Sequence, residues 1–300
     1  MVKKSHAIIA LLLPQGSPLN AKIIGLTALA MTAFAANSVL CRLALGAGLI
    51  DAASFASIRV VAGAIVLALL MAPRWRNKPR APTDWRAVAT LFIYMAFFSF
   101  AYISLSAGTG ALILFGAVQL TMFAVALRSG ERFSVVSWVG LSTALAGLVY
   151  LVSPGITAPD PVGALLMAVA GIAWGVYSLL GRGVTAPLEA TANNFICCVP
   201  LVLIVSVLFL SNFATTIPGL ALAAISGGIT SGIGYAIWYQ ALKALSATHA
   251  ATVQLSVPAI AALGGLVFMS EDVTVRLLIA SAATLSGVWI VLAQRAESDR

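Results

Sequence analysis

The chain has 300 residues, of which 61% are hydrophobic and only 9% charged, and its mean hydropathy is +1.04. A soluble globular domain carries about 25% charged residues, so the composition excludes that class. The formal net charge is +8, but the basic residues lie between apolar segments, which is typical of the positive-inside rule and argues against nucleic-acid binding. The uncharged runs 87–127 and 190–242 are each long enough for two helical membrane crossings, so we expect an all-α, polytopic membrane protein.

The first twenty residues precede the first apolar segment that is long enough to cross a bilayer. Lys3 and Lys4, followed by the apolar run Ala7–Leu13, resemble a signal peptide in outline. The apolar run is short, however, and Pro14–Pro18 leads into the next apolar segment without a clear cleavage site. We therefore expect residues 1–20 to form a cytoplasmic tail.

Ten apolar segments follow, and each has about the length that a helix needs to cross the hydrocarbon core. Polar segments or segments rich in proline and glycine separate them, and several are so short that neighbouring spans must be antiparallel. The expected spans are Ala21–Leu45, Ala53–Ala72, Arg86–Ser106, Gly110–Leu127, Val135–Val152, Val162–Leu180, Thr191–Leu210, Leu220–Leu242, Ala250–Met269 and Val275–Gln294.

A segment of the first span recurs, in degenerate form, in the sixth. Ala30–Arg42 reads AMTAFAANSVLCR, and Ala170–Arg182, which lies 140 residues further along, reads AGIAWGVYSLLGR. The same offset pairs Glu131 with Glu271, although glutamate is rare in this chain. Similarity at a constant offset indicates a duplicated unit. Ten spans in two copies give five spans per copy, and an odd number turns the second copy upside down in the membrane, as in many secondary transporters.

The distribution of basic residues predicts the orientation. With both termini in the cytoplasm, every Lys and Arg falls on the cytoplasmic side except Arg42, Arg59 and Arg276. The expected organisation is a cytoplasmic tail at 1–20, repeat 1 at 21–152 (helices 1–5), a periplasmic linker at 153–161, repeat 2 at 162–294 (helices 6–10) and a cytoplasmic tail at 295–300.

Several of these segments resemble the drug/metabolite transporter superfamily. The residues that carry the resemblance are Ala36, Asn37 and Arg42 in the first span, Arg59 in the second, Glu131 after the fourth, Ala173-Trp174-Gly175 in the sixth, and Pro258 and Glu271 at the ninth. The resemblance covers nearly all of residues 21–294 and is to the ten-helix, two-repeat EamA-type members, most closely to YddG-type exporters of aromatic amino acids. The chain departs from the pattern at Phe34-Ala35, where Trp-Gly is common, and at Val118, whose counterpart in the second repeat is Pro258.

The spans lack the groups that catalysis or ion coupling would require. All nine Asp and Glu residues lie in loops, tails or at span ends, whereas a proton- or cation-coupled antiporter normally carries a carboxylate within the membrane. No cluster of His, Asp, Glu or Cys has the spacing of metal ligands, and no nucleotide-binding motif is present. We interpret His249 as an interfacial histidine and Cys41, Cys197 and Cys198 as packing residues. We expect no enzymatic activity, no cofactor and no metal.

Aromatic residues recur at helical spacing within three spans, where residues at i, i+3 and i+4 share one face. Such a wall suits a planar apolar side chain through offset stacking. The alternative is an interfacial belt, which accounts for Trp75, Trp85 and Trp289 better than for residues inside the spans. The predicted substrate-binding residues of this kind are Tyr94, Phe98 and Tyr102 in the third span, Trp174, Tyr177 and Ser178 in the sixth, and Tyr235, Trp238 and Tyr239 in the eighth.

Three amides lie at membrane depth, namely Asn37, Gln119 and Gln254. A buried amide either bonds a neighbouring helix or faces a wet cavity, and the sequence leaves both roles open. Pro258 lacks an N–H, so the carbonyl of Gln254 loses its helical partner and, with the side-chain amide, suits an ammonium group. We predict that these residues and Ser38 contribute to the binding site.

Arg42 and Arg59 flank the short outer loop between the first two spans. The favoured interpretation is that both side chains snorkel to the interface. The alternative is that they attract carboxylates in an outer vestibule.

These observations predict a secondary transporter that exports neutral, preferentially aromatic, amino acids and similar metabolites across the inner membrane by alternating access. We expect facilitated export and a monomer that contacts only its small-molecule substrate and the lipid bilayer. The alternatives are an exporter of other metabolites or drugs, including nucleotide sugars, and a membrane scaffold that transports nothing.

Overall fold

The computed structural model describes residues 21–76, 82–245 and 247–298, so the tail expected at 1–20 lies outside it, as do the last two residues of the tail expected at 295–300. Over the described ranges the chain is helical, apart from turns and one isolated bridge between Ile50 and Thr215. In chain order the elements are α2 (Ala21–Gly46), α3 (Ala52–Trp75), α4 (Trp85–Ala101), α5 (Ala107–Arg128), α6 (Val135–Val152), α7 (Pro161–Leu180), α8 (Pro187–Leu208), the 3₁₀ helix η1 (Leu210–Asn212), α9 (Ile217–Ile225), the π-helical segment η2 (Ser226–Ile233), α10 (Gly234–Leu242), α11 (Ala247–Gln254), α12 (Ser256–Met269) and α13 (Val275–Ser298).

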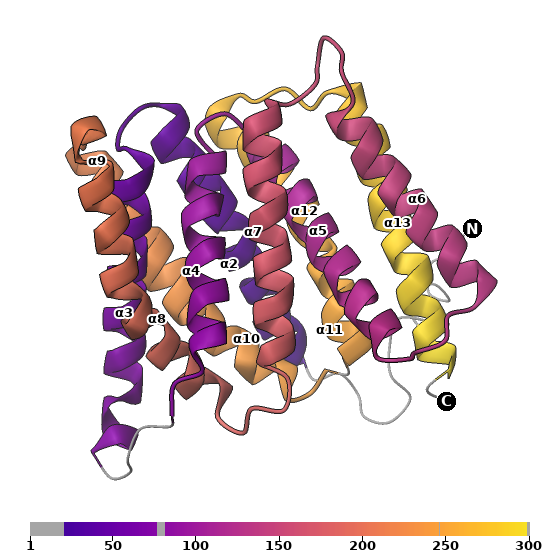
Figure 1. The fold of residues 1–300 in the computed structure, drawn as a ribbon, viewed down its shortest axis with the longest axis horizontal. Helices are drawn as coiled ribbons and strands as arrows, with labels where there is room; N and C mark the ends of the chain where they lie inside the picture. The colour runs from indigo at the N-terminus through magenta and orange to yellow at the C-terminus, as the bar shows by residue number, and fades with distance from the viewer. Residues whose placement is uncertain (1–20, 77–81, 246, 299–300) are drawn as a thin grey trace.

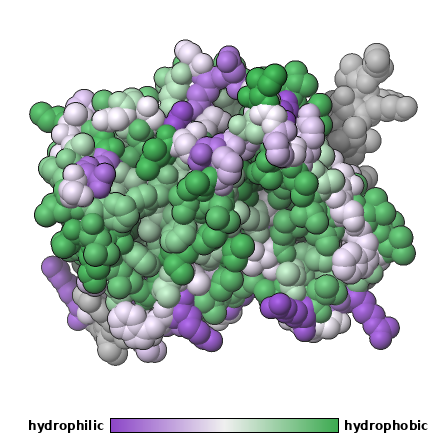
Figure 2. All heavy atoms as spheres, turned by 45° about the horizontal axis from the view of Figure 1, so that its top comes forward, coloured by the Kyte–Doolittle hydropathy of each residue, from purple (hydrophilic) through white to green (hydrophobic). Residues whose placement is uncertain are grey.

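Nine helical segments within the described ranges are long and apolar enough to cross a membrane. Two of these, 217–242 and 249–269, combine several elements. The third expected span corresponds to α4, an apolar helix of only 17 residues. The surface agrees with a membrane environment, because large apolar side chains such as Leu69, Val135 and Phe268 are about 70 to 80% exposed. Figure 2 shows apolar residues around the middle of the molecule and most hydrophilic ones toward its two ends.

The shortness of α4 has a local cause. The helix ends at Ala101, and tight turns follow in which the N–H of Ile103 donates to the carbonyl of Phe100. Ser106 then caps α5, its Oγ accepting from the N–H of Thr109. The segment from Tyr102 to Ser106 is therefore a turn, although it continues the apolar run that predicted a longer span.

Two spans contain irregular backbone. Between α9 and α10, the segment η2 has the sequence SGGITSGI and π-helical hydrogen bonding, which is often found at functional sites. Between α11 and α12, the helix is interrupted at Leu255, whose N–H donates to the carbonyl of Thr252. Pro258 lies one turn after Gln254, so the interruption falls where the missing N–H of proline weakens the helix.

The helices pack as a bundle in which α6 and α13 lie side by side and run in opposite directions (Figure 1). Their contact is close because Gly140 and Gly287 face each other, and a Cβ atom on either would lie within 3 Å of the other's carbonyl oxygen. The hydroxyl of Thr284 on α13 donates to the carbonyl of Ala144 on α6, at 3.4 Å. The remaining helices enclose a core in which α4 packs against α7, and α3 against α8.

A candidate substrate pocket

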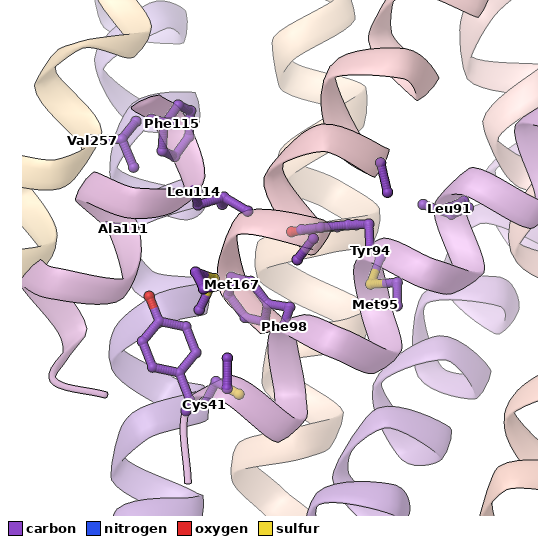
Figure 3. Packing of buried hydrophobic residues seen from close by; sticks show 14 of the residues in the cluster. Cys41, Leu91, Tyr94, Met95, Phe98, Ala111, Leu114, Phe115, Met167 and Val257 are labelled. Atoms are coloured by element: carbon purple, nitrogen blue, oxygen red, sulfur yellow. The ribbon is translucent and has the colours of Figure 1, made fainter. Parts of the chain in front are cut away.

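A pocket lies near the middle of the bundle and is lined by residues of five helices. The lining residues are Phe34, Asn37 and Ser38 from α2, Tyr94 and Phe98 from α4, Leu114 and Phe115 from α5, Trp174 from α7, and Tyr235 from α10. The lining residues of α2, α4, α5 and α7 lie within those helices, and Tyr235 lies at the start of α10, in the interior of the span 217–242. The pocket is therefore remote from both ends of the bundle. Figure 3 shows Tyr94 of α4 and Leu114 of α5 extending toward one another.

Trp174 is the centre of the aromatic wall. Its ring centroid lies 4.8 Å from that of Tyr94, 5.6 Å from that of Tyr235 and 5.4 Å from that of Tyr177. Phe34 closes the wall on the α2 side, at 5.9 Å from Tyr235. Rings at these distances stack or meet edge to face, so the wall offers flat, polarizable surfaces to a planar ligand.

The polar part of the pocket is built on Asn37. Its Oδ1 accepts hydrogen bonds from the hydroxyls of Ser226 and Thr230 in η2, at 2.9 and 2.6 Å, and lies 3.4 Å from Ser231 Oγ. The π-helical segment thus supplies three hydroxyls to one amide. These contacts hold Asn37 in place as a lining residue, and they join α2 to the irregular backbone of η2.

Six of the fourteen residues predicted to bind substrate line this pocket, and their role in binding stays a prediction. These six are Asn37, Ser38, Tyr94, Phe98, Trp174 and Tyr235. The eight that do not line it are Tyr102, Gln119, Tyr177, Ser178, Trp238, Tyr239, Gln254 and Pro258.

The residues outside the pocket have other partners. Tyr102 is fully buried and its hydroxyl donates to the carbonyl of Ala107. Gln254 donates to the carbonyl of Ala250 in its own helix, and Ser178 donates to that of Trp174. Tyr177 and Tyr239 form a polar cluster through Thr191 Oγ1, which lies 3.3 and 2.9 Å from their hydroxyls. Phe34, Leu114 and Phe115 line the pocket but were not predicted, because isolated apolar residues carry no signal in so apolar a sequence.

The structure contradicts the snorkelling interpretation of Arg59. This is the largest fully buried side chain of the described residues. Its Nη2 donates to Tyr94 Oη at 3.1 Å, its Nε lies 3.4 Å from Ser231 Oγ, and its guanidinium carbon lies 4.6 Å from the ring centroid of Phe98. Residues of α4 and η2 therefore enclose the guanidinium, and the side chain does not extend to the membrane interface.

Arg42 also has a different environment from the one expected. Its Nε forms an ion pair with Glu271 Oε1 at 2.9 Å, and its Nη1 donates to the carbonyls of Tyr102 and Ile103. Glu271 accepts from the N–H of Ala107 as well, at 2.8 Å. The pair fastens the end of α2 to the start of α5 and to the turn between α12 and α13.

A second ion pair lies toward the opposite end of the bundle. Arg74 Nε, near the end of α3, lies 2.8 Å from Glu189 Oε2 in the first turn of α8. Asp84 and Arg86, outside the core at the start of α4, form the third pair, and the guanidinium of Arg86 lowers the pKa of the Asp84 carboxyl. None of these charged groups lines the pocket.

Comparisons with known proteins agree with this architecture. The model of the EamA-like transporter family matches residues 161–293. An uncharacterized protein of Pseudomonas aeruginosa is 47% identical over 270 residues, which cover 90% of this chain and 94% of that protein. An uncharacterized transporter of Archaeoglobus fulgidus is 22% identical over 251 residues, which cover 77% of this chain and 84% of that protein.

One solved crystal structure shares the fold at 20% identity, with a TM-score of 0.65 over 92% of this chain and 99% of its own length. The match to a transporter family is consistent with the apolar helices. Residues 161–293 of this multi-pass membrane protein are therefore similar to the EamA-like transporter family.

Proposed function

We propose that this protein exports neutral amino acids, preferentially aromatic ones, and similar metabolites across the inner membrane. The observation that carries the proposal is the pocket wall formed by Trp174, Tyr94 and Tyr235, whose rings converge in the middle of the bundle. The cavity of about 20 Å³ has room for little more than one water molecule in this conformation, so the helices must move apart before a substrate enters. An aromatic side chain would then stack on this wall, while Asn37 and Ser38 provide polar contacts for the amino-acid group.

Alternating access would arise from two inverted halves, 21–152 and 162–294, with both termini in the cytoplasm. A contact between residues 140 positions apart supports this arrangement, because Ala144 and Thr284 are equivalent under the repeat and are hydrogen-bonded where α6 and α13 meet. In a twofold arrangement, equivalent residues touch only near the axis. The opposite directions of α6 and α13 support an axis in the membrane plane.

Counterflow in proteoliposomes tests the proposal. Vesicles loaded with unlabelled phenylalanine should take up labelled phenylalanine, tryptophan and tyrosine faster than protein-free vesicles do. Trp174→Ala should lower the initial rate by about tenfold or more, because it removes the central ring of the wall. Trp289→Ala is the matched control, since Trp289 is 47% exposed on α13. Uptake equal to that of protein-free vesicles for all three amino acids would contradict the proposal.

A second candidate function is export of other planar apolar molecules, and the side of the pocket formed by Phe34, Leu114 and Phe115 favours it. The same vesicles decide between the two. Exchange of an aromatic drug without exchange of any amino acid would favour the second candidate.

A further inference from the structure

Arg59 carries a positive charge that no carboxylate in the described part of the chain neutralises. Its side chain is fully buried in the interior of α3, and no carboxylate within the described residues forms an ion pair with it. Its Nη1 is buried without a hydrogen-bond partner among those residues. A charged side chain at membrane depth is costly, and such a residue usually faces a ligand, an ion or a partner.

The guanidinium lies directly behind one wall of the pocket. It contacts the rings of Phe98 and Tyr94, at 4.6 and 5.6 Å from their centroids, and both residues line the pocket. Through Ser231 it is also joined to Asn37, another lining residue. The charge is therefore one side chain away from the pocket, and at this distance in a medium of low dielectric constant it strongly attracts an anion.

Tyr94 connects this charge to the pocket. Its hydroxyl oxygen accepts a hydrogen bond from Arg59 Nη2 at 3.1 Å, so its own O–H remains available as a donor to a group in the pocket. A hydroxyl that accepts from a cation becomes a stronger donor, because the hydrogen bonds polarise one another. A carboxylate oxygen is the acceptor that best matches such a donor.

We propose that this side of the pocket is a carboxylate subsite, in which Tyr94 and Asn37 contact the anionic group and Arg59 supplies the charge that selects it. The inference rests on the proposed function, because it states which end of an aromatic amino acid lies at α3 and α4. The ring then stacks toward Trp174 and Tyr235, on the far side of Tyr94. An amine without a carboxylate would meet only repulsion from Arg59.

Competition binding to the purified full-length protein in nanodiscs tests the subsite. The competitors are phenylalanine, 3-phenylpropanoate, 3-phenylpropanol and phenethylamine, which share one ring and differ in charge. We expect the two carboxylates to compete about 10- to 100-fold better than the alcohol and the amine, as a hydrogen bond to a charged group contributes that factor. Arg59→Gln should abolish the difference, Tyr94→Phe should reduce it because the charge remains, and Arg59→Lys should restore part of what Arg59→Gln removes.

The chain offers a matched control pair outside the pocket. Arg276 lies over the ring of Tyr150 with its guanidinium carbon 5.6 Å from the centroid, as Arg59 does over Tyr94. Arg276→Gln and Tyr150→Phe should leave the carboxylate preference unchanged. Tyr94→Phe removes a single hydroxyl, so it keeps the test informative if Arg59→Gln does not fold.

The outcomes separate this inference from the proposed function. If 3-phenylpropanoate binds but phenylalanine does not, the subsite stands and the amino-acid cargo fails. If phenylalanine binds equally well to wild type, Tyr94→Phe and Arg59→Gln, the subsite is overturned while the cargo remains. Competition by phenethylamine as strong as that by 3-phenylpropanoate in the wild type would also overturn the subsite.

Discussion

At the scale of single residues, glycines decide how closely the helices around the pocket approach one another, because they have no side chain. Gly227 in η2 packs against the backbone of α3, and a Cβ atom there would lie 2.0 Å from the carbonyl oxygen of Arg59. Gly63 on α3 would meet the ring of Phe195 at 2.5 Å in the same way. The close approach that these glycines permit lets Ser231 reach the guanidinium of Arg59.

We predict that Gly227→Ala separates α3 from η2 and lowers the free energy of unfolding by about 1–3 kcal/mol or more, the usual cost of overpacking. Gly25→Ala is the control, since nothing lies within 4 Å of a Cβ atom at Gly25 in α2. There the substitution should stabilise the helix by about 0.5–1 kcal/mol. Denaturation of both variants in detergent micelles checks the prediction, and equal stabilities would contradict it.

At the scale of elements, the length of the apolar runs and the polar or proline-rich loops between them predicted most of the helices. The expected spans Val135–Val152 and Val162–Leu180 agree closely with α6 and α7. In the structure, Ser134 caps the start of α6 and Asp160 caps the start of α7. The predicted end of the third span, at Ser106, was wrong, because hydropathy does not distinguish an apolar turn from a helix.

The environment of Arg59 could not be read from the sequence either. Whether an arginine two turns into a span snorkels or is enclosed depends on its neighbours in space, and these come from α4 and η2. The π-helical form of η2 could not be read from the sequence either, because the backbone that its glycines adopt depends on contacts with α2 and α3.

The ion pair between Arg42 and Glu271 joins α2 to the turn between α12 and α13. Arg42 lies one helical turn after Ser38, which lines the pocket. Both side chains of the ion pair are partly buried, with 24% and 14% of their surface exposed. We predict that Glu271→Gln, which keeps the shape and removes the charge, makes this end of the bundle open more often.

Alkylation of the native Cys41 measures that opening, because this thiol adjoins Arg42 and is fully buried. In a background with Cys197→Ser and Cys198→Ser, Glu271→Gln should speed alkylation by roughly 5- to 30-fold, as expected for a loss of about 1–2 kcal/mol. Arg74→Gln breaks the pair at the other end and should leave the alkylation rate at the wild-type value. The same rate in Glu271→Gln and wild type would show that the ion pair does not hold this end closed.

At the scale of the whole molecule, charge is arranged in an unusual way for a coupled transporter. The ion pairs lie toward the ends of the bundle, and the residues that line the central pocket include no Asp, Glu or His. The charged group behind the pocket wall is an arginine, which stays protonated at any physiological pH. Within the described residues, the pocket therefore offers no group that would exchange a proton for substrate.

We predict that transport does not depend on a proton gradient. Counterflow of the transported substrate should vary by less than about twofold between pH 6 and pH 8, because the residues that line the pocket include no Asp, Glu or His. An imposed pH gradient should not drive accumulation of substrate above the concentration outside the vesicles. The matched measurement uses the same vesicles with an ionophore that dissipates the pH gradient. Vesicles with and without the ionophore should reach the same final ratio of substrate inside to substrate outside. Accumulation that the ionophore abolishes would contradict the prediction and would require a titrating group elsewhere in the chain, such as His249 near the start of the ninth span.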